Sequence, residues 1–135
     1  MTVLVDTSVW SLALRRSVPA NGKVTEELAN LVRRGEAVII GPVRQEVLSG
    51  VKDATQFRML RDHLRAFPDV RVQSADFEEA AVCFNRCRAK GIQGSNTDFL
   101  MCAVAARRGL AIFTTDGDFT ELLRVLPLTL HRAGG

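Results

Sequence analysis

The chain of 135 residues has few of the residues and motifs that mark several common classes of enzyme. Its two histidines, His63 and His131, stand far apart and outside any spacing typical of a metal site or an activated nucleophile. This disfavours an enzyme built on a Ser–His or Cys–His pair. The glycine-rich patterns that bind dinucleotides or nucleotide phosphates are absent, as is the HExxH zinc pattern. Apolar runs stay well short of the roughly 20 residues that span a membrane, so we expect no membrane association.

Cysteine is also scarce, with only Cys83, Cys87 and Cys102, and no two of them form a CxxC motif. An odd number of cysteines on expected helices gives no disulfide framework, so we expect a reducing, cytoplasmic compartment. Cys83 and Cys87 have the i,i+4 spacing of two ligands on one helix face. Neither a histidine nor a third thiol lies near them, and buried helical cysteines are common, which disfavours a metal role. The N-terminus leads into an apolar run without the pattern of a signal peptide.

The overall composition is that of an ordinary soluble globular protein, with 47% hydrophobic and 24% charged residues. We expect residues 1–135 to form one domain with a hydrophobic core. The net charge of +3 weakly favours polyanions as binding partners. The arginine pairs at 33–34 and 107–108 each precede a glycine, which is typical of helix C-termini.

Short apolar runs of β type alternate with amphipathic stretches. The β-type runs are at residues 3–5, 37–40, 70–72, 111–113 and 128–130. The helical stripes span Val24–Val32, Phe57–Phe67, Phe77–Cys87 and Phe99–Val104. The stronger β-type runs do not alternate with polar residues, as expected for strands covered on both faces. The pattern therefore predicts an α/β fold with a parallel sheet of four or five strands and helices on both sides.

Four carboxylates stand where an expected strand ends or an expected helix begins. Asp6 and Asp116 follow the first and fourth β-type runs, whereas Glu46 and Asp98 lie on expected helices. Because the carboxyl ends of parallel strands meet at one edge, where ligands bind, we expect these side chains to converge. Four converging acids repel one another unless cations hold them. The pattern therefore indicates a hard divalent metal, and beside a basic surface it indicates work on phosphate esters.

Each acid also has a purely structural explanation. Asp6 could cap the first helix, and Asp98 stands three residues after Ser95, as in a capping box. Glu46 could be a solvated helix residue, although it borders the apolar face of its helix. Singly, these explanations are more common than catalysis; the joint pattern favours a shared site.

The two acids after the 111–113 run are expected to differ in role. Asp116 follows the run directly, so we expect it to reach the metal. Asp118 stands three residues before Glu121, so we expect it to cap the next helix at a stability gain of about 1 kcal/mol.

The segments at 5–10, 42–47, 96–100 and 114–119 together resemble the four motifs of PIN-domain ribonucleases. In size and layout the chain is most similar to the VapC toxins of bacterial toxin–antitoxin pairs. The resemblance implies a three-layer α/β/α sandwich, usually dimeric, that cleaves RNA with Mg²⁺ or Mn²⁺ and is inhibited by a small antitoxin. It also implies that four acids form a catalytic and metal-binding quartet: Asp6, Glu46, Asp98 and Asp116. The hydroxyl of Thr114 is expected to order the site, and Ser8 has a similar but less certain place.

In the expected mechanism, water activated by metal attacks phosphorus, and no protein nucleophile is required. Arg15, Arg16 and Arg44 are candidates for contacts with RNA phosphate because they lie near Asp6 and Glu46 in sequence.

Two alternatives stay open. The first is a PIN-like domain that binds RNA or a partner without cutting. The second is a receiver-like signalling domain, which needs a lysine late in the chain; the last lysine here is Lys90. For Trp10, packing in the core or at a dimer interface is favoured over base stacking.

Overall fold

The computed structural model describes residues 1–14 and 22–133. Three short, buried strands form a parallel sheet in the order β2–β1–β3, with β1 at Val3–Val5, β2 at Ala37–Val38 and β3 at Ala111–Phe113. Leu4 of the central strand is level with Val38 on one side and Ile112 on the other. Parallel neighbours require crossover connections, and helices supply them here.

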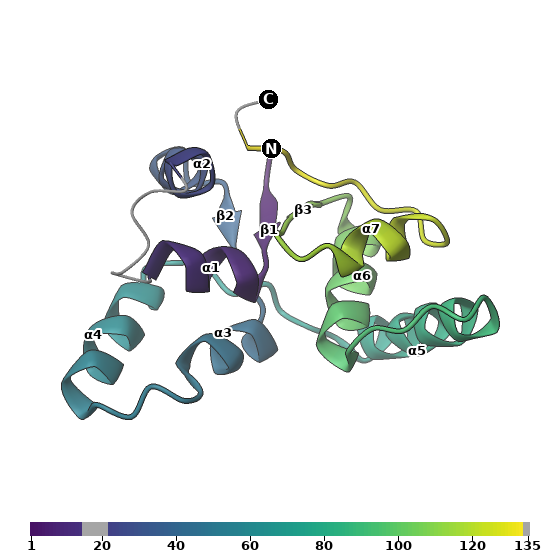
Figure 1. The fold of residues 1–135 in the computed structure, drawn as a ribbon, viewed down its shortest axis with the longest axis horizontal. Helices are drawn as coiled ribbons and strands as arrows, with labels where there is room; N and C mark the ends of the chain where they lie inside the picture. The colour runs from purple at the N-terminus through teal and green to yellow at the C-terminus, as the bar shows by residue number, and fades with distance from the viewer. Residues whose placement is uncertain (15–21, 134–135) are drawn as a thin grey trace.

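Seven helices lie in the described residues. They are α1 (Thr7–Leu14), α2 (Gly22–Arg33), α3 (Gly41–Leu48), α4 (Ala54–Leu64), α5 (Ser74–Ala89), α6 (Asn96–Arg108) and α7 (Asp118–Leu123). Figure 1 shows β1 at the centre, with α1 to α4 gathered on the side of β2 and α5 to α7 on the side of β3. The predicted α/β fold with a parallel sheet and helices on both sides is confirmed.

The two outermost β-type runs do not form regular strands. Each makes one isolated parallel bridge, Ile39 with Asp69 and Ile112 with Leu130, so the described residues hold three strands where four or five were predicted. Each run follows a proline, at 68 and 127, and lies at an edge of the sheet. Proline donates no N–H to a ladder, and an edge has only one neighbour, so pairing ends after one bridge.

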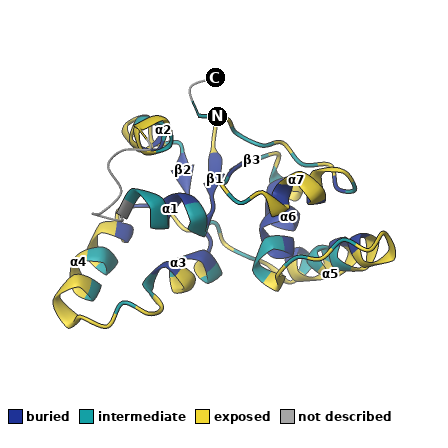
Figure 2. Ribbon diagram, viewed as in Figure 1, coloured by how far each residue is buried: buried dark blue, intermediate teal, exposed yellow. Residues whose placement is uncertain are grey.

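The core is centred on α6, in which every residue from Phe99 to Ala105 is buried. Figure 2 shows this helix and the strands mainly in the colour of buried residues, while α4 is largely exposed. A helix that is apolar all round is covered on all sides, and α5 provides one of those layers. The three cysteines are buried free thiols, and burial raises the pKa of Cys102 most.

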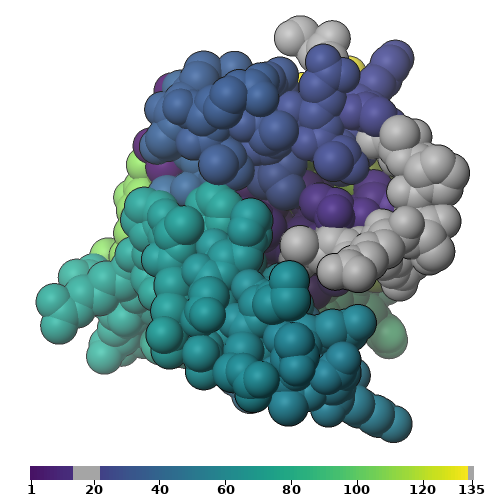
Figure 3. All heavy atoms as spheres, turned by 90° about the vertical axis from the view of Figure 1, so that its left-hand side faces the viewer, coloured from purple at the N-terminus to yellow at the C-terminus, as the bar shows by residue number. Residues whose placement is uncertain are grey.

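Trp10 of α1 packs in the core, which is one of the two packing roles favoured from the sequence. It is 1% exposed, and its ring centroid lies 4.7 Å from that of Phe67. α1 contacts both α2 and α3. On the face turned to the viewer in Figure 3, the α2 region lies above the α4 region, with part of the purple N-terminal segment visible between them.

One buried ion cluster joins α5 to α6. Asp76 is fully buried, and its Oδ1 accepts hydrogen bonds from Arg107 at 2.6 Å and from Arg108 at 2.7 Å. Its Oδ2 accepts from the backbone N–H of Gln73 at 2.7 Å, which forms a capping box at the start of α5. Hydrogen bonding from Arg108 is the main reason that the pKa of Asp76 lies far below its ordinary value. The arginine pair that was expected only to end a helix therefore also neutralises a core carboxylate.

No helix in residues 1–14 or 22–133 is long and apolar enough to cross a membrane.

Candidate active site

An open cleft of about 660 Å³ lies at the carboxyl edge of the sheet. It is formed by the chain after β1, the chain after β3, helix α3 and the loop that enters α6. The residues that line it are Asp6, Thr7, Ser8, Glu46, Gln93, Gly94, Ser95, Asp98, Asp116 and Asp118. All four predicted carboxylates therefore line one cleft, as the convergence of strand ends requires.

Asp6 is the most deeply placed of these acids, at 5% exposed. The hydroxyl groups of Ser8 and Thr114 both donate to its Oδ2, each at 2.8 Å. The backbone N–H of Thr115 donates to the Ser8 hydroxyl at 3.0 Å. The Asp6 side chain thus receives hydroxyl groups rather than the helix N–H groups of a simple cap, and the network joins the ends of β1 and β3.

The chain after β3 contradicts the predicted capping role of Asp118. The N-cap of α7 is Gly117, and no capping box with Glu121 forms. Instead the Asp118 backbone N–H donates to Asp116 Oδ1 at 2.9 Å. A carboxylate two residues upstream is within reach of this N–H, as in an Asx turn, so Asp116 takes over the local stabilising role. Asp118 is exposed and lines the cleft.

Asp98 both caps α6 and lines the cleft, the two roles considered for it from the sequence. The Ser95 hydroxyl accepts from the Asp98 N–H at 3.1 Å, and Asp98 Oδ2 accepts from the Ser95 N–H at 3.2 Å, which completes the predicted capping box. The same side chain lines the cleft. Burial raises the pKa of Asp98, and the charges of Asp6 and Asp116 raise it further, while the hydrogen bonds with Ser95 lower it.

Glu46 borders the buried face of α3, as expected, because Val43 and Val47 are the buried residues of this helix. Its own side chain is exposed. The hydroxyl of Thr7, at the start of α1, donates to Glu46 Oε1 at 2.9 Å.

Within the described residues, the cleft combines uncompensated negative charge with carboxylate oxygen atoms that accept no hydrogen bond. Neither Lys, Arg nor His is among its described lining residues. Each carboxylate of the quartet uses one oxygen as an acceptor: Asp6 Oδ2, Glu46 Oε1, Asp98 Oδ2 and Asp116 Oδ1. Their other oxygens accept no hydrogen bond within residues 1–14 and 22–133. Carboxylate oxygens backed by neutral donors are the ligands that Mg²⁺ and Mn²⁺ prefer, so the donor chemistry fits a hard divalent ion.

The donor groups are of the right chemical kind for a divalent ion, but their present positions do not form a binding site. As the described side chains stand, no group of three or more His, Cys, Asp or Glu could hold a metal ion. The hydrogen bonds above hold Asp98 and Asp116 near the starts of α6 and α7, and they hold Glu46 at the start of α1. Side-chain rotation would be needed to bring several oxygens to one ion.

Of the three arginines proposed for phosphate contacts, Arg44 is described, and it is not among the residues that line the cleft. Arg44 points its guanidinium group at Asp69, with Nη2 to Oδ1 at 2.9 Å, and at the carbonyl of Phe67 at 3.3 Å. Arg15 and Arg16 lie outside the described residues.

Two further cleft residues carry structural constraints that were not predicted. Thr7 binds Glu46 across 39 positions of sequence, which no local pattern reveals. Gly94 packs so closely that an added Cβ would lie 3.2 Å from the ring of Phe99. A glycine inside the loop before α6 was the only sequence sign of this close approach.

A parallel sheet with an acidic cleft at the ends of β1 and β3 defines the class of this protein. Residues 3–124 match the PIN domain, and the chain belongs to this family. It is similar to the VapC ribonuclease Mb1587 of Mycobacterium bovis, with 30% identity over 131 residues that cover 93% of this chain and 95% of the relative. Ribonuclease VapC11 of Mycobacterium tuberculosis is similar to the same extent.

Two solved structures share the fold. VapBC2 from Rickettsia felis, bound to a DNA fragment from its promoter, matches with a TM-score of 0.78, 18% identity, and coverage of 97% of this chain and 98% of that one. FitAcB from Neisseria gonorrhoeae matches with a TM-score of 0.77, 17% identity and 97% coverage of both chains.

Proposed function

We propose that this protein is a metal-dependent endoribonuclease and the toxin of a type II toxin–antitoxin pair. The observation that carries the proposal is the cleft itself, in which five carboxylates gather and no Lys, Arg or His of residues 1–14 or 22–133 joins them. Such a cleft repels the phosphates of RNA until a metal ion neutralises it. The similarity to two ribonucleases over nearly the whole chain supports RNA as the substrate.

In this proposal, Asp6, Glu46, Asp98 and Asp116 hold Mg²⁺ or Mn²⁺. The chemistry that such an ion supplies when bound is activation of water and neutralisation of charge on the phosphodiester. The hydroxyl groups of Ser8 and Thr114 fix Asp6 through its Oδ2 and leave Oδ1 for the ion.

Asp118 is a fifth candidate, because it lies exposed in the same cleft. A PIN-like domain that binds RNA without cutting is the competing proposal, and only an activity measurement separates the two.

We propose a small antitoxin as the protein partner, by analogy with the toxin–antitoxin complexes among the structural neighbours. A cytoplasmic location follows from the same proposal, since the RNA substrate is there.

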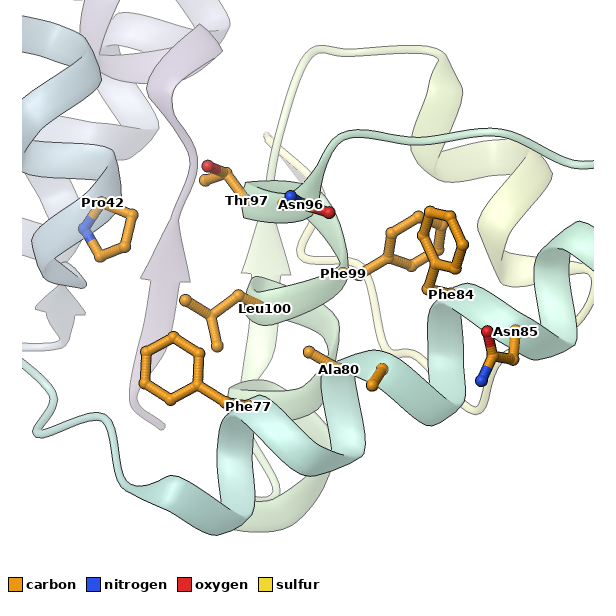
Figure 4. Close-up of a pocket in the computed structure, with 10 residues that line it drawn as sticks. Pro42, Phe77, Ala80, Phe84, Asn85, Asn96, Thr97, Phe99 and Leu100 are labelled. Carbon is orange, nitrogen blue, oxygen red and sulfur yellow. The ribbon is translucent and has the colours of Figure 1, made fainter.

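We also propose that the protein forms a homodimer through an apolar groove of about 490 Å³ between α5 and the starts of α3 and α6. Figure 4 shows the Phe77 and Phe84 rings on this groove, with Pro42 across from them. Phe77 is 56% exposed, and exposed aromatic groups of this kind gain free energy when a partner covers them. Phe77→Asp should yield monomers in sedimentation. Met59→Asp on α4 is the matched control, because Met59 is equally exposed, at 58%, and lies outside the groove.

The proposed activity is tested with purified protein and single-stranded RNA. Cleavage should appear with Mg²⁺ or Mn²⁺, stop in excess EDTA, and return when the metal is restored. Cleavage that continues undiminished in EDTA would rule out the mechanism. RNA binding without cleavage in any divalent metal would favour the non-catalytic alternative.

A further inference from the structure

We infer that Thr7 is a positioning residue that holds Glu46 ready for metal binding. The Thr7 hydroxyl donates to Glu46 Oε1 at 2.9 Å, and both residues line the acidic cleft. The inference deepens the proposed function and rests on it, because it takes Glu46 to be a metal ligand.

The other three acids of the quartet are short side chains, and each accepts a hydrogen bond from a group within three residues of it in sequence. Asp98 is held by Ser95, and Asp116 by the N–H of Asp118. Asp6 is buried beneath two hydroxyl groups. In these positions, the local chain already limits the rotamers.

Glu46 has no comparable support from its own helix. It is exposed, it has three rotatable bonds, and its polar contact comes from a residue 39 positions away. A side chain of this length loses considerable rotamer freedom when it is fixed. A donor that fixes it before the ion arrives lessens that loss at the moment of binding.

Thr7 is well placed to be this donor. It directly follows Asp6, so its position is set by the end of β1, and α1 packs against α3. Threonine is branched at Cβ, which restricts its χ1 and keeps the hydroxyl in a narrow range of directions. The hydrogen bond uses Oε1 only and leaves Oε2 for the metal.

The test uses Thr7→Val, which removes the hydroxyl at nearly constant shape, and Thr7→Ser, which restores it. Thr25→Val is the matched control, because Thr25 is an exposed helical threonine on α2, outside the cleft. Binding of Mn²⁺ alone is measured by titration calorimetry, and cleavage is followed as a function of Mn²⁺ concentration. Circular dichroism establishes that each variant is folded.

Thr7→Val should weaken Mn²⁺ binding about 10-fold, the size of effect seen when an outer partner of a ligand is lost. The Mn²⁺ concentration for half-maximal cleavage should rise by the same factor, while cleavage at saturating Mn²⁺ changes less. Thr7→Ser and Thr25→Val should bind Mn²⁺ as the unmodified protein does.

The same substitution is also made in the Glu46→Ala variant, so that failure of the inference can be distinguished from failure of the proposed function. In Glu46→Ala, which should itself weaken Mn²⁺ binding, adding Thr7→Val should have no further effect. An equal 10-fold loss in that background would show that Thr7 does not act through Glu46. Unchanged Mn²⁺ binding in Thr7→Val alone would also overturn the inference. If Glu46→Ala binds Mn²⁺ and cuts RNA normally, the proposed quartet itself is wrong.

Discussion

Carboxylates lie in two regions of this molecule, the core and the cleft, and among the described residues only those in the core have neighbours that balance their charge. In the core, Asp76 is fully buried and meets two guanidinium groups, and its pKa is lowered. In the cleft, burial raises the pKa of Asp98, and the charges of Asp6 and Asp116 raise it further. The first region is complete within the protein, whereas the second has negative charge that the described residues leave unbalanced.

The difference separates a structural acid from a functional one. A buried charge requires a partner, and Arg107 and Arg108 provide two. Among the described residues, the cleft acids receive only neutral donors, which orient them without neutralising them. A perturbed pKa alone would mark both regions, so the sign of the shift and the identity of the neighbours decide between them.

The largest difference between the regions should appear in catalysis. Asp6→Asn should lower RNA cleavage by at least about 100-fold, because loss of a ligand exceeds the effect of losing an outer partner. RNA binding should be retained or tightened, since one negative charge near the phosphates is gone. A variant that cuts at the normal rate would mean that Asp6 is a structural residue like Asp76.

The converse variant should affect stability. Asp76→Asn should lower the free energy of unfolding by about 3 kcal/mol, the low end for breaking a buried ion pair, because Arg107 and Arg108 are partly exposed. Chemical denaturation measures this, and cleavage by the folded fraction should be normal. Asp62→Asn is the control: its pair with Arg61 is exposed, so the change should be well under about 1 kcal/mol.

Asp116 should combine the two behaviours. Asp116→Ala should abolish cleavage and also cost about 1 kcal/mol, because the N–H of Asp118 loses its acceptor. Asp118→Ala should leave stability nearly unchanged. Denaturation of both variants would decide the matter, and a larger loss for Asp118→Ala would restore the capping role that the sequence predicted.

The smallest effect should be a dependence on pH, measured in EDTA. Because the folded-state pKa of Asp98 is raised, its contribution to stability is present below the ordinary pKa of aspartate and is lost as pH rises through the higher folded-state value. Asp98→Asn should therefore melt higher than the unmodified protein at neutral pH, and the gap should close on acidification. A difference in melting temperature that does not change with pH would mean that folding does not disfavour the charged form of Asp98.

The sequence predicted those parts of the molecule that depend on local pattern. The runs at 3–5 and 111–113 became buried strands, and the run at 37–40 became a strand over Ala37–Val38. The runs beside Pro68 and Pro127 at the sheet edges did not. Gathering of the four acids followed from parallel topology, which fixes where strand ends meet.

Contacts between distant side chains could not be predicted in this way. The Thr114 hydroxyl reaches Asp6 across 108 positions, and Arg108 reaches Asp76 across 32. Capping of α7 was misjudged because the Asp118–Glu121 spacing is common, and the turn formed by Asp116 has no distinct pattern.

The most direct test of the contrast is thermal unfolding over a series of Mn²⁺ concentrations. Unmodified protein should melt at increasing temperature as Mn²⁺ rises, because the ion binds the folded cleft and balances its charge. Asp76→Asn should start lower and rise in parallel, whereas Asp6→Asn should stay flat. A rise in Asp6→Asn equal to that of the unmodified protein would contradict the claim that the acidic cleft is the site of the metal.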